Sequence, residues 1–405
     1  MSRWFTLPYC SDCGEARVPH ALYKFQSRAE HLMEYVEIFF NKLGEKSYPR
    51  FIHLNLDHYV IIFFEWLAKM GLATLVFDTD PRDSIRTKSL FEGARTAGVD
   101  LRQFRIFNIG DNGTFIARKG GKELLFAVMP RPRNFVSPSL AWMDDKGLLK
   151  TFLMPRGIPT ADGGVATTEA EALTIFDRIG PPVITKPYRT SRGIHTTLNI
   201  ETRDGLRTAF HIAKQVTPYV IVEKELQGIV YRVTLIGGKV SGVVKRDYPL
   251  VLGDGQSTVR ELLDVENENP LRDNFAFFKI APNDRAEVQL KRQRLTWDSI
   301  PKINEHVILN DKVSRRHGTV TIDETDETHP ENNALFEKIA HELGDPLIGV
   351  DFMIGDMSRS WKEQPGSGLI ECNAMPYIDL HHYPYKGKPR DVAKDLWDYV
   401  FSYHS

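Results

Sequence analysis

Three oxygen-bearing side chains interrupt apolar segments in the C-terminal part of the sequence. Asp351 stands inside the run 349–354, and Glu371 and Asn373 stand two residues apart in the run 369–373. Because side chains alternate between the two faces of a strand, Glu371 and Asn373 should point the same way. If the two runs are neighbouring strands, Asp351 joins them. Three hard oxygen ligands, of the kind that Mg²⁺ prefers, then converge.

The alternative for these three residues is that they are polar side chains at sheet edges and face solvent. Charged residues are almost never fully buried without a partner. Two acids in separate core-like strands therefore favour the metal-binding interpretation.

Two lysines have positions that suit phosphate binding. Lys186 ends the apolar strand expected at 183–186, and Lys146 stands at the start of an expected helix, where a cation opposes the helix dipole. Both can reach phosphate oxygens as point charges, although ordinary surface lysines are the alternative. The polar loop 188–195 follows Lys186, and its backbone N–H groups can cradle phosphate. Its spacing matches neither a P-loop nor a dinucleotide-binding fingerprint.

Composition excludes several classes of protein. The chain has 405 residues, 42% of them hydrophobic, and a formal net charge of −1, so no global field attracts nucleic acid or an anionic membrane. We therefore expect neither as a partner. The longest apolar run, 60–64, is far shorter than the roughly 20 residues of a membrane span. The first residues do not resemble a signal peptide, and three cysteines fit a reducing cytoplasm, which is the expected location.

The two N-terminal cysteines form a C-x-x-C pair, which can supply half a zinc site or a redox centre. Cys10 and Cys13 are followed by His20, a candidate third ligand, but the sequence offers no evident fourth ligand and no second pair. We interpret the two cysteines as incidental.

The N-terminal part alternates helix and strand patterns, which predicts an α/β domain over 1–138 with a largely parallel sheet. The prolines near residue 138 mark the boundary. The expected helices are 27–43, 57–71 and 81–98, and the expected strands are 51–56, 72–77, 103–107, 115–119 and 122–128, the last two joined by a turn at Gly120 and Gly121.

The second part, 139–405, carries further helices and strands and an insertion at about 267–299 without sustained periodicity. The expected helices are 146–157, 168–180, 202–216, 331–344 and 391–403, and the expected strands are 183–186, 196–200, 220–225, 229–236, 239–245, 347–354 and 369–373.

Several motifs follow one another in a fixed order. They are Lys146, Lys186-Pro187, Val222–Leu226, Tyr231-Arg232, Gly237-Gly238-Lys239, the Gly253-Asp254-Gly255 segment with its following helix, Asn304–Val307, Thr328–Pro330, Asp351 and Glu371–Asn373. Over residues 140–390 this order resembles the ATP-grasp superfamily, and it is similar to the ATP-grasp module of cyanophycin synthetase and the fused glutathione synthetases. The resemblance implies two α+β lobes that grip ATP. The N-terminal part resembles a pre-ATP-grasp domain in position and α/β character.

The resemblance also implies roles. Lys146 and Lys186 would contact the phosphates of ATP, and the loop 188–195 would close as a lid. The segment Glu223, Lys224, Glu225 and Leu226 would form the hinge that holds adenine, with the backbone of Lys224 and Leu226 reading its edge.

For the reacting groups, Asp351, Glu371 and Asn373 would hold Mg²⁺, or Mn²⁺ in its place. Arg232 would steady the acyl phosphate or the incoming carboxylate. Together with Lys186 it would act in catalysis.

The sequence departs from the family pattern at a few positions. Val230 replaces an acid that would bind ribose, Thr190 and Ser191 replace lid glycines, and Asp379 stands where relatives often carry arginine. Arg315 and Arg316 are either a grip for an anionic substrate or a solvated basic loop. The pair His381 and His382 lines an acceptor pocket or is a satisfied structural pair.

We therefore expect an ATP-dependent carboxylate–amine ligase that forms an amide through an acyl phosphate, with an amino acid or short peptide as substrate. The alternatives are a phosphotransferase on the same scaffold and a nucleotide-binding regulatory protein without turnover. Many relatives form dimers, so a homodimer is open. The chain ends at Ser405, after the closing helix, so we do not expect polymer synthesis of the cyanophycin kind.

Overall fold

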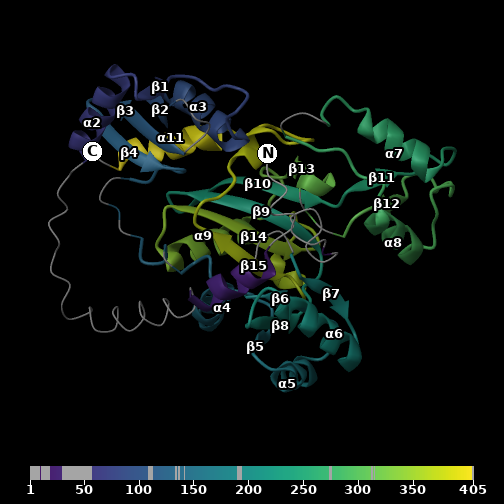
Figure 1. The fold of residues 1–405 in the computed structure, drawn as a ribbon. Helices are drawn as coiled ribbons and strands as arrows, with labels where there is room; N and C mark the ends of the chain where they lie inside the picture. Colours follow the sequence, from purple (N-terminus) through teal and green to yellow (C-terminus); the bar gives the residue numbers. More distant parts are fainter. Residues whose placement is uncertain are drawn as a thin grey trace. The chain divides into compact units, whose positions relative to one another are not determined.

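The structure is a computed structural model. It describes residues 10, 19–29, 57–107, 113–132, 135, 137–140, 142–188, 194–272, 276–311, 313 and 315–403 (Figure 1). The expected strand 51–56, most of the helix expected at 27–43, and the core of the loop 188–195 lie outside these residues. The chain divides into two compact units. The first comprises 1–53, 142–227 and 365–371, and the second 54–141, 228–364 and 372–405. The functional boundary expected at residue 138 stays a prediction.

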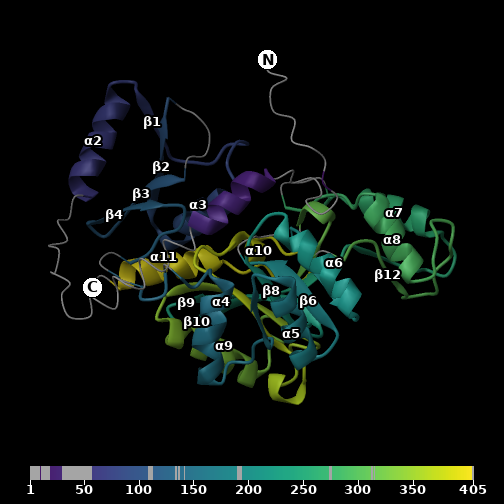
Figure 2. The ribbon, with the colours of Figure 1, turned by 60° about the horizontal axis from the view of Figure 1, so that its bottom comes forward.

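The first unit is an antiparallel sheet with two helices packed against it (Figure 2). Its strand order is β5-β8-β6-β7, and apolar residues of α5 and α6 form one core with the sheet. The elements are α4 (Lys146–Leu153), β5 (Gly163–Ala166), α5 (Glu169–Ile179), β6 (Val183–Pro187), β7 (Thr197–Ile200), α6 (Arg203–Lys214) and β8 (Val220–Lys224), with a 3₁₀ turn at Met154–Arg156.

Local side-chain caps explain why the helices of this unit begin where the sequence predicts. The Thr168 side chain accepts a hydrogen bond from the backbone N–H of Glu171, and Glu171 reaches back to the N-cap backbone, which completes a capping box for α5. Thr202 caps α6 in the same way through the N–H of Gly205. These contacts satisfy N–H groups that the first turn of a helix leaves without a partner.

The N-terminal segment of the second unit forms the sheet β1-β2-β3-β4, and its strand pairs are antiparallel. The expectation of a largely parallel sheet is therefore wrong. A parallel pair needs a crossover of about a dozen residues, whereas Gly120 and Gly121 reverse the chain in two. The elements are α2 (Asp57–Lys69), β1 (Ala73–Val76), α3 (Ile85–Ala97), β2 (Asp100–Ile106), β3 (Thr114–Lys119) and β4 (Lys122–Ala127).

Helix α3 begins four residues after the expected Pro81, because the preceding residues bind an arginine instead. The buried Arg105 donates to Asp80 over 2.6 Å and to Asp83 over 2.5 Å. Ser84 then caps the helix by accepting from the N–H of Thr87 over 3.2 Å.

Helix α11 (Val392–Ser402) packs on α3 and on the sheet of β3 and β4, as Figure 1 shows. Trp397 is fully buried in this core and donates its indole N–H to the carbonyl of Leu90 over 3.0 Å. Gly93 allows the close approach of the two helices, because a Cβ there would lie 2.6 Å from the carbonyl carbon of Ala393.

The second sheet of this unit carries two of the expected metal ligands, Asp351 and Asn373. Its order is β13-β10-β9-β14-β15, and β9 and β10 turn at Gly237 and Gly238, both at positive φ. The division between the units falls within β15, after Glu371. The elements are β9 (Ile229–Ile236), β10 (Lys239–Asp247), β13 (Val320–Asp323), α9 (Pro330–Leu343), β14 (Leu347–Ile354), β15 (Gly368–Asn373) and α10 (Asp379–His382), with 3₁₀ turns at Arg315–His317 and Trp361–Glu363.

A small subdomain occupies the region around the expected insertion. It comprises β11 (Leu250–Leu252), α7 (Val259–Asn267), α8 (Asp284–Arg292) and β12 (His306–Ile308), which share one apolar cluster. The sequence missed α8, which Asn283 caps and which buries Ala286 and Leu290. Within the described ranges, no helix is long and apolar enough to cross a membrane.

The contact at Gly93 gives a stability prediction. Gly93→Ala gains helix propensity, yet we expect it to lower the stability by about 1–3 kcal/mol because the new methyl group overpacks the contact with Ala393. The control is Thr96→Ala, on the exposed side of the same helix, which should be neutral or slightly stabilising. Denaturant titration measures both, and an unchanged midpoint for Gly93→Ala would contradict the packing described.

Candidate functional site

A buried carboxylate holds two lysines together in the first unit. The side chain of Glu223, on β8, has only 4% of its surface exposed, and its two oxygens form ion pairs with Lys186 of β6 and Lys150 of α4. Ile184, two residues before Lys186, is the register partner of Glu223. The sheet therefore brings the Lys186 and Glu223 side chains onto one face.

The surroundings of this cluster lower the pKa values of Lys150 and Lys186. Burial and the neighbouring charge of Lys146 lower the pKa of Lys150 to about 7. Burial, followed by the charges of Lys150 and Lys146, places the pKa of Lys186 well below its ordinary value. Lys150 and Lys186 share one buried carboxylate, and the charge of Lys146 acts on both, so an added anion would stabilise this site.

Lys146 begins α4, directly after the residue that caps the helix. Asp145 caps the helix by accepting from the N–H groups of Gly147 and Leu148, each over 2.8 Å, and it also accepts from the Tyr188 hydroxyl over 2.8 Å. The Lys146 ammonium lies 3.1 Å from a carboxylate oxygen of Glu371, in the same unit. This pairing offsets the cost of a cation at a helix N-terminus.

The segment expected to hold adenine runs from β8 into a short extended stretch. The backbone N–H groups of Lys224 and Glu225 donate to the carbonyls of Asp162 and Pro182 over 2.7 and 3.1 Å, and that of Gln227 donates to Gly366 over 2.9 Å. Within the described part of the chain, the N–H of Leu226 donates to no protein acceptor. Leu226 can therefore offer a backbone donor, whereas Lys224 can offer only its carbonyl.

Asp351 is held by a bidentate ion pair in the second unit. Arg232 of β9 is its register partner across the sheet, and its Nε and Nη2 donate to the two carboxylate oxygens over 2.5 and 3.0 Å. Both side chains are buried, and Arg246 approaches the same carboxylate at 3.5 Å. Gly349 makes room, because a Cβ there would lie 3.0 Å from Nη1 of Arg232.

The strands that carry the expected metal ligands are neighbours, as the sequence required. β14, with Asp351, lies beside β15, and Asn373 follows Glu371 by two residues on β15. The Nδ2 atom of Asn373 is buried and has no hydrogen-bond partner among the described residues. A buried polar atom without a partner is rare in a folded protein and marks a place where further chemistry is expected.

Two of the residues that depart from the family pattern pair with each other. Arg315 forms an ion pair with the fully buried Asp379 over 2.5 Å, so the acid at position 379 has a cation beside it. Ser314 and the side chain of Arg316 lie outside the described residues.

His381 and His382 are both buried, and their role, in an acceptor pocket or as a structural pair, stays a prediction. His381 contacts the hydroxyl of Thr234 over 2.8 Å, and burial lowers its pKa to about 3, which keeps the imidazole neutral. His382 accepts from the N–H of Ala393 over 2.9 Å.

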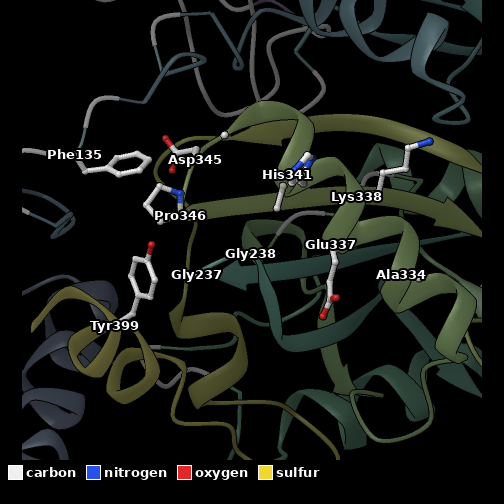
Figure 3. A pocket seen from close by; sticks show the side chains of 12 residues that line it. Phe135, Gly237, Gly238, Ala334, Glu337, Lys338, His341, Asp345, Pro346 and Tyr399 are labelled. Atoms are coloured by element: carbon white, nitrogen blue, oxygen red, sulfur yellow. The ribbon is translucent and has the colours of Figure 1, made fainter. Parts of the chain in front are cut away.

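A pocket elsewhere in the second unit contains none of these residues. It measures about 570 Å³ and lies where the β9–β10 turn meets the end of α9. Tyr399 and Phe135 line one end, and Glu337 and Lys338 line the other (Figure 3).

Sequence reasoning missed two members of the site. Lys150 lies four residues after Lys146 on α4, a spacing that places both on one helix face and was available as a signal. Arg246 lies in β10, opposite Val230, and no local pattern distinguishes it from an ordinary strand arginine.

Comparison with known proteins identifies the family. No family model matches the chain. The cyanophycin synthetase of Synechocystis sp. is 34% identical over 263 residues, which is 64% of this chain and 30% of that protein. The solved structure of a bifunctional glutathione synthetase from Pasteurella multocida has a TM-score of 0.60 at 26% identity, and the match covers 78% of this chain and 43% of that one. The chain belongs to the ATP-grasp ligase family.

A third relative matches over a longer part of the chain. The bifunctional glutathione-biosynthesis protein of Mannheimia succiniciproducens is 29% identical over 331 residues, covering 78% of this chain and 42% of that protein. The chain thus spans less than half the length of these relatives. The expected family and ATP-grasp fold are confirmed, with antiparallel sheets in place of a parallel one.

The buried cluster gives a second prediction. Glu223→Gln leaves two buried lysines without their counter-charge, so we expect a loss of about 3 kcal/mol in stability below neutral pH. As the pH rises towards about 7 the loss should shrink, because without Glu223 the folded chain releases the Lys150 proton at a lower pH than the wild type does while the unfolded chain still binds it, so the stability of the variant rises with pH where that of the wild type does not. Thermal unfolding at a series of pH values up to neutrality measures it.

The matched control for Glu223→Gln is Glu225→Gln, two residues further along. Glu225 accepts from the N–H of Asn199 over 2.7 Å, and a glutamine oxygen preserves that bond. An equal loss in both variants would show that the charge of Glu223 is not what the cluster needs.

Proposed function

We propose that this chain is an ATP-dependent carboxylate–amine ligase, which activates a carboxylate as an acyl phosphate and transfers the acyl group to an amine. The observation that carries the proposal is the lysine cluster, in which Lys150 and Lys186 share the buried Glu223 and Lys146, close enough to lower their pKa values, pairs with Glu371. Cations with lowered pKa values gain most from a polyanionic ligand, and ATP is the polyanion that this family uses.

The residues of the first unit would bind the nucleotide. Lys146 and Lys186 would contact phosphate oxygens, and the N–H of Leu226 and the carbonyl of Lys224 would read the adenine edge. Glu223 would hold Lys186 in position while the phosphates bind. Val230, where an acid would bind ribose, leaves the sugar with one contact fewer.

Asp351, Glu371 and Asn373 fit Mg²⁺ by their donor chemistry, because two carboxylates and an amide oxygen are the hard ligands it takes. The two hydrogen bonds from Arg232 leave lone pairs of Asp351 available for a metal ion, because a carboxylate has about four lone-pair sites. When bound, the ion would neutralise charge on the phosphoryl group during transfer.

The arginines of the second unit would position the reacting carboxylate. Arg232 and Arg246 meet at Asp351, and a planar guanidinium suits a carboxylate or acyl phosphate. We infer an amino acid or short peptide as the carboxylate substrate. The amine is a second substrate of the same class.

The test is Mg²⁺-dependent nucleotide release with hydroxylamine present and amino acid pools added in turn. ADP, phosphate and a hydroxamate in one pool would support the proposal. AMP and pyrophosphate would replace it with adenylation, and a stable phosphorylated product without an amine requirement would identify a phosphotransferase. ATP binding without release under any pool would indicate a regulatory protein.

One pair of variants sharpens this test. Asp351→Asn removes a proposed ligand charge at nearly constant shape, and we expect ADP release to fall more than about 100-fold. The control is Asp356→Asn, an exposed acid just beyond the same strand, which should keep wild-type turnover. Steady-state ADP formation at saturating Mg²⁺ measures both, and wild-type turnover in Asp351→Asn would refute the assignment.

A further inference from the structure

Three metal-ligating side chains from distant parts of the sequence meet in the first unit. Cys10, His20 and His195 each direct one ligand atom into the same space, and these atoms all lie within 4.8 Å of one another. The Cys10 sulfur lies 3.7 Å from Nε2 of His195, and the rings of His20 and His195 meet edge to face at 4.9 Å. The sequence had suggested His20 but placed His195 in the proposed lid.

The orientation of His195 is fixed by a bond on the far side of its ring. Its Nδ1 lies 2.8 Å from the carbonyl oxygen of Ile212. Because a carbonyl can only accept, Nδ1 carries the proton, and Nε2 of the neutral ring presents its lone pair toward Cys10. Metal-binding histidines are held in this way, with the second nitrogen donating to a backbone carbonyl.

The backbone at His195 is also unusual. Its φ is +53°, in the left-handed region that residues other than glycine seldom adopt, and its side chain is buried. Such conformations persist only where the surrounding structure stabilises them, and they are common at functional sites. Ile194 and Val216 pack with Cys10 and form a small apolar wall beside the cluster.

The spacing suits one metal in particular. Zinc–sulfur and zinc–nitrogen bonds of about 2.3 and 2.0–2.1 Å at a tetrahedral angle separate the two ligand atoms by about 3.5 Å. The observed 3.7 Å between Cys10 and His195 nearly meets that value. A thiolate with two imidazoles is a soft to borderline set, which selects zinc over Mg²⁺.

We propose that Cys10, His20 and His195 form a zinc site at the end of the expected lid loop, with none of the residues expected to bind adenine or Mg²⁺. The ion would fasten the N-terminal segment that contains Cys10, and the helical segment 20–29, to the chain just before β7. Three protein ligands leave a fourth position for water or a further ligand. Cys13 follows Cys10 by three positions in the sequence but lies outside the described residues, and the proposal stands on the other three.

The experiment measures metal binding rather than ligase activity. The full chain, reduced and stripped of metal, is titrated with Co²⁺ as a spectroscopic stand-in for zinc. We expect one ion per chain, tetrahedral d–d bands, a thiolate-to-cobalt charge-transfer band, and displacement of cobalt by one equivalent of Zn²⁺. Cys10→Ser should abolish the charge-transfer band, and His20→Ala should weaken binding at least about tenfold.

Controls separate this site from other histidines and from the ligase proposal. His211→Ala removes an exposed histidine of the same unit, paired with Glu169, and should bind cobalt like the wild type. Asp351→Asn should also bind normally, so loss of ligase activity and loss of zinc are distinguishable.

A chelator supplies a second measurement. It should lower the unfolding midpoint of the zinc-loaded wild type and leave that of Cys10→Ser unchanged. The proposal is overturned if the wild type binds no stoichiometric cobalt, if the spectrum lacks the thiolate band, or if Cys10→Ser retains it.

Discussion

The buried carboxylate of Glu223 is the contact on which the lysine cluster of the first unit depends. Lys150 and Lys186 share it, and without it their charges would have to be buried alone. Burial, together with the charges of the neighbouring lysines, nevertheless lowers the pKa values of both lysines. A polyanion bound beside these lysines would offset the cost of their burial, which is the basis for proposing them as the phosphate-binding site.

The second unit uses the same principle with the charges reversed. Asp351 is the acid that the proposed metal needs, and Arg232 holds it in place across the sheet. Buried ion pairs are weak sources of net stability. Their value in both units is that a charged side chain is kept in one orientation until its ligand arrives.

Local chemistry explains which elements the sequence predicts well. The capping box of Thr168 and Glu171 and the C-cap glycine at Gly344 fix their helix ends within a few residues, so the boundaries of α5 and α9 were accessible. The direction of the N-terminal strands was not, because an alternation of helix and strand does not itself specify strand direction. Helix α8 was missed because its apolar residues are few.

The candidate site likewise contains residues that the sequence could predict and contacts that it could not. Asp351, Glu371 and Asn373 were visible because polar residues in apolar strands are conspicuous. The ion-pair partners of the site residues could not be predicted, because Glu223 pairs with a lysine 37 positions away and Asp351 with an arginine 119 positions away. The sequence indicated only part of the proposed zinc site, because His195 lies in a polar loop and only the fold brings it beside the other two ligands.

The most direct measurement of the central claim is proton uptake when MgATP binds. Above neutral pH, Lys150, with a pKa of about 7, is largely neutral in the ligand-free protein. Phosphate beside it would raise that pKa, so calorimetry at about pH 8 in buffers of different ionisation enthalpy should show uptake of up to about one proton per ATP. Binding heats that do not depend on the buffer would contradict the claim that the phosphates of ATP bind at this lysine cluster.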